Sequence, residues 1–149
     1  MAVMVTYLLD TNILVHLIRG KAVGVAIDRH FNLRAGLNRC VISVVTVGEM
    51  HSLARKWKWG VKKLETLQSV LDELVWIDIN HPAILTAYGE LDHLSNRAGR
   101  PMGKNDVWIA ATVSVSGATL LTTDGDFDHL HPVSLNRIRV DKSTGDPLP

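Results

Sequence analysis

Short, largely apolar runs recur along this chain, and they restrict the folds open to it more than any other feature. The clearest runs are rich in branched aliphatic side chains and show no apolar–polar alternation; they are Val5–Leu9, Cys40–Val45 and Ala118–Thr122. A strand that is covered on both faces has this continuous pattern, whereas a half-exposed strand alternates. The runs therefore predict buried, parallel strands.

Helical patterns fill the segments between these runs. Gly20 is predicted to end a first helix, and a second helix is predicted over Ala22–Leu37. Weaker strand patterns are present at Val75–Ile79 and, as an edge strand, at Arg137–Val140. Strands that alternate with helices predict an α/β fold with a central, mainly parallel sheet.

Polar residues predict where three of the helices begin. Either Thr11 or Asn12 is expected to cap the helix after the first strand. Thr46 and Glu49 have the spacing of a capping box after the second strand. Asn105 is expected to cap the helix that contains Val107–Val115.

The length and the apolar amino-terminal segment set limits on domain number and location. A chain of 149 residues suits one domain, which we expect over 1–140, with a polar, flexible tail over 141–149. Asp10 and Asn12 interrupt the apolar segment, so neither an export signal nor a membrane span is expected. We therefore expect a cytoplasmic protein that does not enter a membrane.

Acidic residues follow the predicted strands. Asp10 ends the first strand, Glu49 lies one helical turn beyond the second, and Asp124 follows the run that begins at Ala118. Asp106 opens the helix after a glycine-rich loop. In open α/β sheets, ligands bind beyond the carboxyl ends of the strands. Clustered carboxylates repel one another unless a hard cation such as Mg²⁺ or Mn²⁺ neutralises them, so these positions predict a metal site.

Each acid taken alone has a simpler explanation as a turn, cap or surface residue. Their joint placement favours a site, although Asp126 competes with Asp124 for the fourth position. If four of the 15 acidic residues belong to a site, 16 basic residues remain against 11 acidic ones. A basic body around an acidic pocket suits a polyanionic substrate, and metal-activated water suits phosphodiester hydrolysis.

Four segments of the chain form an ordered set of motifs: Leu8–Asn12, Ser43–Met50 with Gly48-Glu49, Gly103–Ala111 and Leu120–Phe127. In this order they resemble the motifs of PIN-domain ribonucleases, and in particular those of VapC-type toxins of VapBC toxin–antitoxin systems. The resemblance covers roughly Val5–Leu130 and implies a three-layer α/β/α PIN-like fold.

The resemblance also implies an activity, a site and partners. It implies an Mg²⁺- or Mn²⁺-dependent endoribonuclease that forms a homodimer and is inhibited by a VapB-like antitoxin. The implied catalytic and metal-binding residues are Asp10, Glu49, Asp106 and Asp124. Supporting roles are expected for Asn12 and Thr123, which orient carboxylates or contact phosphate, and for Asp126, which competes for the fourth acidic position.

Two groups of basic residues are candidates for RNA binding. Arg97, Arg100 and Lys104 lie close to Asp106 in the sequence. A second group surrounds Trp57 and Trp59 and consists of Arg55, Lys56, Lys58, Lys62 and Lys63. Basic residues interleaved with aromatics suit a nucleic acid, but a solvated helix face with tryptophans in the core explains the same pattern.

Three other functions remain open at the level of sequence. The chain is alternatively a PIN nuclease of RNA processing, a non-catalytic binding module or a phosphatase for small phosphoesters. A neighbouring gene for a small DNA-binding antitoxin would favour the toxin. Intact acids at all four positions favour catalysis over binding alone.

Overall fold

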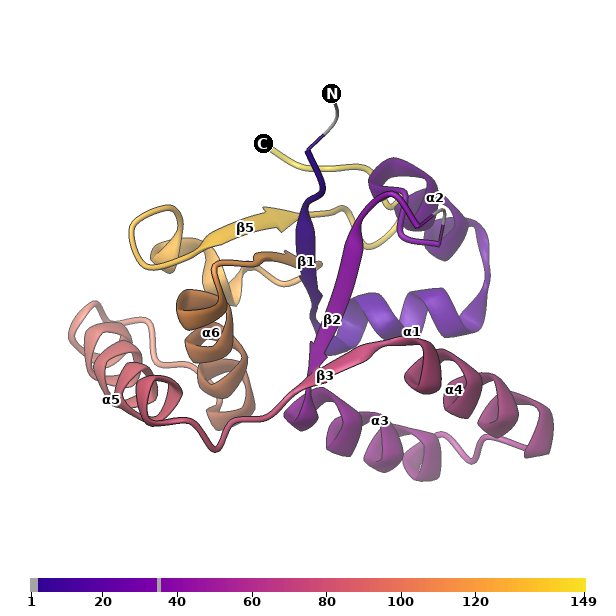
Figure 1. Ribbon diagram of the computed structural model, residues 1–149, viewed down its shortest axis with the longest axis horizontal. Coiled ribbons are helices and arrows are strands. Elements are labelled where there is room, and N and C mark those ends of the chain that lie inside the picture. The colour runs from indigo at the N-terminus through magenta and orange to yellow at the C-terminus, as the bar shows by residue number, and fades with distance from the viewer. Residues whose placement is uncertain (1–2, 35) are drawn as a thin grey trace.

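The computed structural model describes residues 3–34 and 36–149, which form a parallel sheet between two layers of helices (Figure 1). The strands are β1 (Thr6–Leu9), β2 (Arg39–Ser43), β3 (Val75–Ile77), β4 (Thr119–Thr122) and β5 (Asn136–Arg139). Their order across the sheet is β3-β2-β1-β4-β5, and every neighbouring pair is parallel. The predicted α/β fold with a central parallel sheet is confirmed.

The helices divide between the two faces of the sheet. One face is covered by α1 (Thr11–Arg19), α2 (Ala22–Phe31), α3 (Val44–Lys56) and α4 (Val61–Glu73). The other face carries α5 (Pro82–Arg97), α6 (Lys104–Ser116) and the 3₁₀ helix η1 (Gly125–Leu130). Among residues 3–34 and 36–149, no helix is both long enough and apolar enough to cross a bilayer.

Two hydrophobic cores explain why the strands show continuous apolar patterns. In β1, Tyr7 and Leu9 pack into the core under α1–α4, whereas Leu8 packs into the core under α5 and α6. Burial of both faces removes the need for alternation along the strand.

Two predicted boundaries were wrong. The second helix ends at Phe31 instead of Leu37, because Asn32 adopts a left-handed conformation (φ 52°) and terminates it. The predicted strand over Cys40–Val45 ends at Ser43, and α3 begins with the next residue. The branched valines at the start of α3 resemble a strand in sequence, but tertiary packing places them in a helix.

The predicted helix caps were also wrong. Asp10, not Thr11 or Asn12, caps α1. Ser43 caps α3 by accepting a hydrogen bond from a backbone amide two residues ahead, so Thr46 and Glu49 form no capping box and lie inside the helix. In α6 the cap is the glycine before Lys104, and Asn105 lies in the first turn.

Residues 141–149 return to the body of the protein beside α2. Leu148 N donates a hydrogen bond to Arg139 O at 2.8 Å. His30 Nε2 lies within hydrogen-bond distance of Asp146 Oδ1, at 2.9 Å. A Cβ added at Gly145 would lie 3.1 Å from Ala26 Cβ, which shows how closely this turn packs on α2. The flexibility expected for this segment stays a prediction.

Candidate active site

The four predicted acids meet where the strand order changes direction. The chain moves from β1 to β2 on one side, while β4 pairs with β1 on the other, so a crevice opens beyond their carboxyl ends. Asp10 follows β1, Asp124 follows β4, Glu49 projects from α3 and Asp106 lies in the first turn of α6. Together they line one pocket of about 410 Å³.

Asp10 is the most deeply buried of these acids, with 3% of its surface exposed. Its Oδ1 accepts a hydrogen bond from Thr11 N at 2.8 Å. Its Oδ2 accepts from Thr122 Oγ1 at 2.7 Å and from Asn12 Nδ2 at 3.2 Å. The parallel pairing of β1 with β4 places these groups together. The pairing continues at Asp10, whose N donates a hydrogen bond to Leu121 O at 3.0 Å. The Asp10 carboxylate is therefore held in one orientation.

The loop after β4 is tied to the same carboxylate. Thr122 Oγ1 accepts a hydrogen bond from Asp124 N at 2.9 Å while it donates to Asp10. Asn12 Oδ1 accepts from Thr123 N at 3.1 Å. Thr123 thus contributes its backbone amide, and Asn12 connects Asp10 with the loop that carries Asp124.

Glu49 is positioned from α1. Thr11 Oγ1 donates a hydrogen bond to Glu49 Oε1 at 2.7 Å. The hydroxyls of Thr11 and Thr46 are themselves hydrogen-bonded at 3.1 Å, and both threonines are buried. These contacts join α1 to α3 at the pocket. Sequence reasoning missed the hydroxyls of Thr11, Thr46 and Thr122, because the partner of each hydroxyl lies far away along the chain.

Three carboxylates are close enough to share one cation. Asp106, Asp124 and Asp126 each offer an oxygen, and these three oxygens lie within 4.8 Å of one another. Oxygen ligands of this kind suit a hard cation such as Mg²⁺ or Mn²⁺. Asp106 and Asp124 are half-buried and Asp126 is exposed, so this group of carboxylates opens to solvent.

Burial and neighbouring charges raise the pKa values of Asp10 and Asp106. Burial raises the pKa of Asp10 to about 6, with smaller increases from the charges of Glu49 and Asp124; the hydrogen bond from Thr122 opposes this rise. Burial raises the pKa of Asp106 to about 7, and repulsion from Asp10 and Asp124 adds to the shift. A divalent cation would relieve this concentration of negative charge, so the donor set fits a metal.

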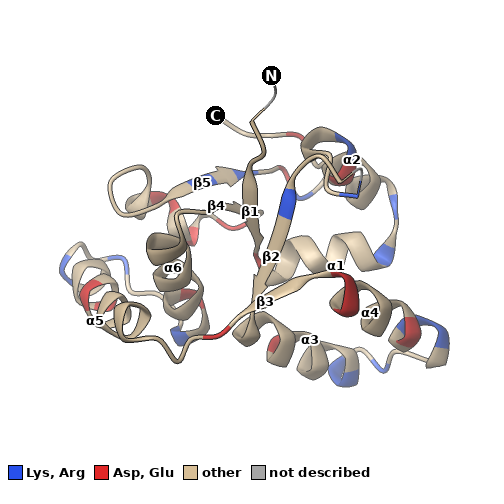
Figure 2. Cartoon of the chain, in the orientation of Figure 1, with Lys and Arg blue, Asp and Glu red and all other residues tan. Residues whose placement is uncertain are grey.

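The rim of the pocket carries an aromatic and basic group that sequence analysis did not connect to the acids. His16, Arg19 and Trp57 line the same pocket. His16 and Arg19 follow Asn12 at helical spacing, and this regularity was the available signal. In Figure 2, acidic segments lie between α6 and the ends of β1 and β4, whereas many Lys and Arg segments lie on the outer helices and their loops.

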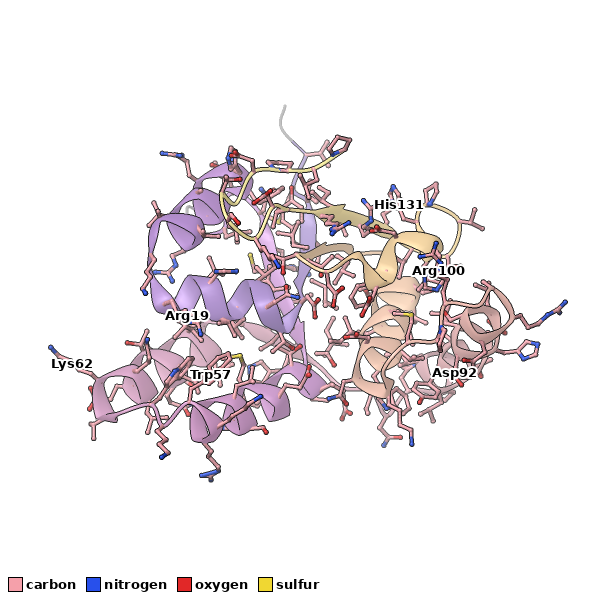
Figure 3. The ribbon with its side chains drawn as sticks, turned by 180° about the vertical axis from the view of Figure 1, so that it is seen from behind. Arg19, Trp57, Lys62, Asp92, Arg100 and His131 are labelled. Carbon is pink, nitrogen blue, oxygen red and sulfur yellow. The ribbon has the colours of Figure 1, made fainter. Side chains whose placement is uncertain are left out.

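The basic residues proposed for RNA binding lie in different places. Arg97, Arg100 and Lys104 are all exposed. Figure 3 shows Arg100 on the side of the molecule formed by α5, α6 and η1, away from Arg19 and Trp57. Their contact with RNA stays a prediction. In the second group, Trp59 packs partly into the core while Trp57 is exposed, and contact of this group with a nucleic acid stays a prediction.

Comparison with known sequences gives a consistent result. A family model described as "PIN domain" matches residues 7–131. Ribonuclease VapC2 of Haemophilus influenzae is 26% identical over 121 residues, covering 81% of this chain and 88% of the relative. The tRNA(fMet)-specific endonuclease VapC of Shigella flexneri is 29% identical over 121 residues, with the same coverage of 81% and 88%.

Comparison with solved structures gives the same fold. A chain of VapBC2 from Rickettsia felis, bound to a DNA fragment from its promoter, aligns with a TM-score of 0.77 and 27% identity over 91% of this chain and 99% of that one. A chain of VapBC-1 from nontypeable Haemophilus influenzae aligns with a TM-score of 0.73 and 23% identity, covering 90% and 97%. At 23% identity, the likeness to VapBC-1 shows a shared fold alone.

Proposed function

The chain belongs to the PIN domain family, and from this premise we propose that it is a metal-dependent endoribonuclease, the toxin of a type II toxin–antitoxin pair. The observation that carries the proposal is the meeting of Asp10, Glu49, Asp106 and Asp124 in one pocket at the carboxyl ends of β1 and β4. The ribonuclease names of the relatives from Haemophilus influenzae and Shigella flexneri support the same activity.

In this proposal, Asp10, Asp106 and Asp124 hold Mg²⁺ or Mn²⁺, with Asp126 as a further ligand on the solvent side. A cation held there would polarise the phosphodiester and lower the pKa of bound water. Thr122 and Asn12 hold the Asp10 carboxylate in one orientation at this pocket. Thr11 orients Glu49, which we assign to positioning the attacking water.

The proposed partners follow from the relatives. RNA is the proposed substrate, since one relative is named an endonuclease specific for tRNA(fMet). A VapB-like antitoxin is the proposed inhibitor, since several structural neighbours are VapBC complexes. We further propose a homodimer that acts in the cytoplasm.

Induced expression in a bacterial host tests the toxin assignment. Wild-type protein should arrest growth and cleave a defined cellular RNA, and Asp106→Asn at equal protein level should do neither. Co-expression of a small protein encoded beside the gene should restore growth. Normal growth with undiminished RNA during wild-type expression would contradict the toxin, and purified protein that still cleaves RNA would then indicate an RNA-processing nuclease.

A further inference from the structure

Trp57 presents an exposed aromatic surface at the edge of the acidic pocket. Its side chain lines the same pocket as Asp10, Glu49, Asp106 and Asp124, and 39% of the residue is exposed. A large aromatic side chain that is both exposed and next to a charged pocket is unusual for a residue that only fills a core. The catalytic arrangement described above gives Trp57 no role.

The backbone fixes the position of this indole. Lys58 takes a left-handed conformation (φ 53°) just after α3. Lys58 N donates a hydrogen bond to Arg55 O at 3.1 Å, and Trp59 N donates to Ala54 O at 3.0 Å, which together form a Schellman turn. Trp59 packs partly into the core and anchors the turn, while Trp57 at the helix end stays at the surface. The indole is therefore presented by a defined turn.

Arg19 completes a flat, cationic surface with Trp57. The Arg19 guanidinium carbon lies 4.7 Å from the centre of the Trp57 ring. The centres of the Trp57 and Trp59 rings lie 5.8 Å apart. Figure 3 shows Arg19 and Trp57 together in the space between α1 and α3. A guanidinium stacked on an indole keeps its planar face and its N–H donors for a ligand.

We propose that Trp57 and Arg19 form a stacking site for one unpaired base of the RNA, beside the bond that is cleaved. The inference rests on the proposed function and adds a substrate-positioning element to it. Every nucleobase has a face that stacks on an indole, and Arg19 can donate to the adjoining phosphate. The base must be unpaired and unstacked, so the site selects single-stranded RNA or a loop over a continuous duplex.

Charge and continuity favour RNA over a protein at this surface. The segment 55–63 contains basic residues and no acidic ones, and Lys63 Nζ lies 5.3 Å from the Trp59 ring centre. A polyanion held at the carboxylates through a cation would lie within reach of Trp57 and Arg19, because all of them line the same pocket. A peptide inhibitor at this surface is the alternative outcome of the test below.

Equilibrium binding on an uncleaving background tests the site. Asp10→Asn protein with Mn²⁺ is titrated against a short fluorescein-labelled RNA that spans the cleavage site mapped with wild-type protein. A series of the same RNA carries one abasic site at successive positions. Adding Trp57→Ala should weaken binding of intact RNA by about tenfold. When the abasic site is at one particular position beside the cleaved bond, Trp57→Ala should lower the affinity by less than about twofold, because the base that stacks is already absent.

Matched variants separate stacking from a general loss of structure. Trp57→Phe keeps an aromatic face and should retain most of the affinity. Trp76→Ala removes another exposed tryptophan (47% exposed) on β3 and should leave binding unchanged. Circular dichroism checks that each variant is folded.

Each failure has a separate meaning. Wild-type protein that neither binds nor cleaves RNA would overturn the proposed function and this inference with it. Wild-type protein that cleaves RNA, combined with Trp57→Ala that binds all RNAs as its parent does, would overturn only the stacking site and leave the indole to a protein partner. An equal loss of affinity for every abasic RNA would also overturn it, since no base would then be coupled to Trp57.

Discussion

Thr122 Oγ1 donates a hydrogen bond of 2.7 Å to Asp10 Oδ2, joining two residues that are 112 positions apart in the chain. The same hydroxyl accepts from Asp124 N at 2.9 Å. One buried threonine thus orients the carboxylate after β1 and the loop after β4. It also opposes the rise in the pKa of Asp10 that burial causes. The position of the proposed metal site depends on this contact.

Replacing this hydroxyl should impair cleavage without unfolding the protein. Thr122→Val keeps the shape of the side chain but removes the donor, so the pKa of Asp10 should rise further above its value of about 6. We expect cleavage at pH 7 to fall by about tenfold, as for other groups that orient metal ligands. The loss should shrink as the pH is raised, because Asp10 is then ionised again.

A pH–rate profile at saturating Mn²⁺ measures this effect. Thr122→Ser, which restores the donor, serves as the control and should behave like the wild type. A profile for Thr122→Val that is superimposable on the wild-type profile would show that the hydroxyl does not tune Asp10.

The metal-free protein should lose stability as the pH rises. Asp10 and Asp106 have pKa values raised to about 6 and about 7, so the folded state binds protons more tightly than the unfolded state. Their contribution is complete below the unfolded pKa of about 4 and is lost as the pH rises through the folded values. For Asp10 we expect a loss of about 1 to 2 kcal/mol in the free energy of unfolding between pH 5 and pH 8.

Urea denaturation in EDTA across this pH range measures the loss. Asp10→Asn should show a shallower dependence, and saturating Mn²⁺ should abolish the decline in the wild type. Stability that rises steadily from pH 5 to pH 8 in EDTA would contradict the assignment of raised pKa values to the folded state.

The two acids that compete for the fourth position should differ in their effects. Asp124 lines the pocket and contributes to the raised pKa values of both Asp10 and Asp106, whereas Asp126 is exposed at the start of η1 and contributes to that of Asp106 alone. We expect Asp124→Asn to reduce cleavage by about a hundredfold and Asp126→Asn by about tenfold or less. Single-turnover rates on one labelled RNA compare them, and the reverse order would assign the fourth position to Asp126.

A glycine in α2, at the contact with α1, should not tolerate a side chain. A Cβ added at Gly24 would collide with the carbonyl group of His16, so the two helices would have to separate. Gly24→Ala should destabilise the protein by about 1 to 3 kcal/mol. Gly89→Ala, placed in α5 where nothing lies within 4 Å of the added carbon, is the control and should stabilise by about 0.5 to 1 kcal/mol. Thermal denaturation measures the stability of both variants. Equal midpoints for Gly24→Ala and Gly89→Ala would contradict the close contact at Gly24.

The sequence was most informative where one local pattern determines the outcome. Continuous apolar runs predicted the buried strands, and Gly20 and Gly117 end their helices in left-handed conformations. The convergence of Asp10 and Asp124 was predictable, because the carboxyl ends of parallel strands lie at one edge of a sheet.

It was least informative where a partner lies far away along the chain. Nothing local to Thr122 or Thr11 indicates that their hydroxyls bind Asp10 and Glu49. The capping-box pattern at Thr46 was misleading because Ser43 already caps the helix, which left the Thr46 hydroxyl for Thr11. Trp57 was visible as an aromatic among basic residues, but only the fold places it beside the acids.

The most direct test of the central claim is metal add-back to stripped protein, with RNA cleavage as the measurement. Wild-type and Asp10→Asn proteins are treated with EDTA, dialysed, and given Mg²⁺ or Mn²⁺ in increasing amounts with a labelled RNA. We predict no cleavage in EDTA, saturable recovery with either cation for the wild type, and a rate lower by about a hundredfold or more for Asp10→Asn. Full cleavage in EDTA, or equal recovery in both proteins, would contradict a metal centre built on Asp10.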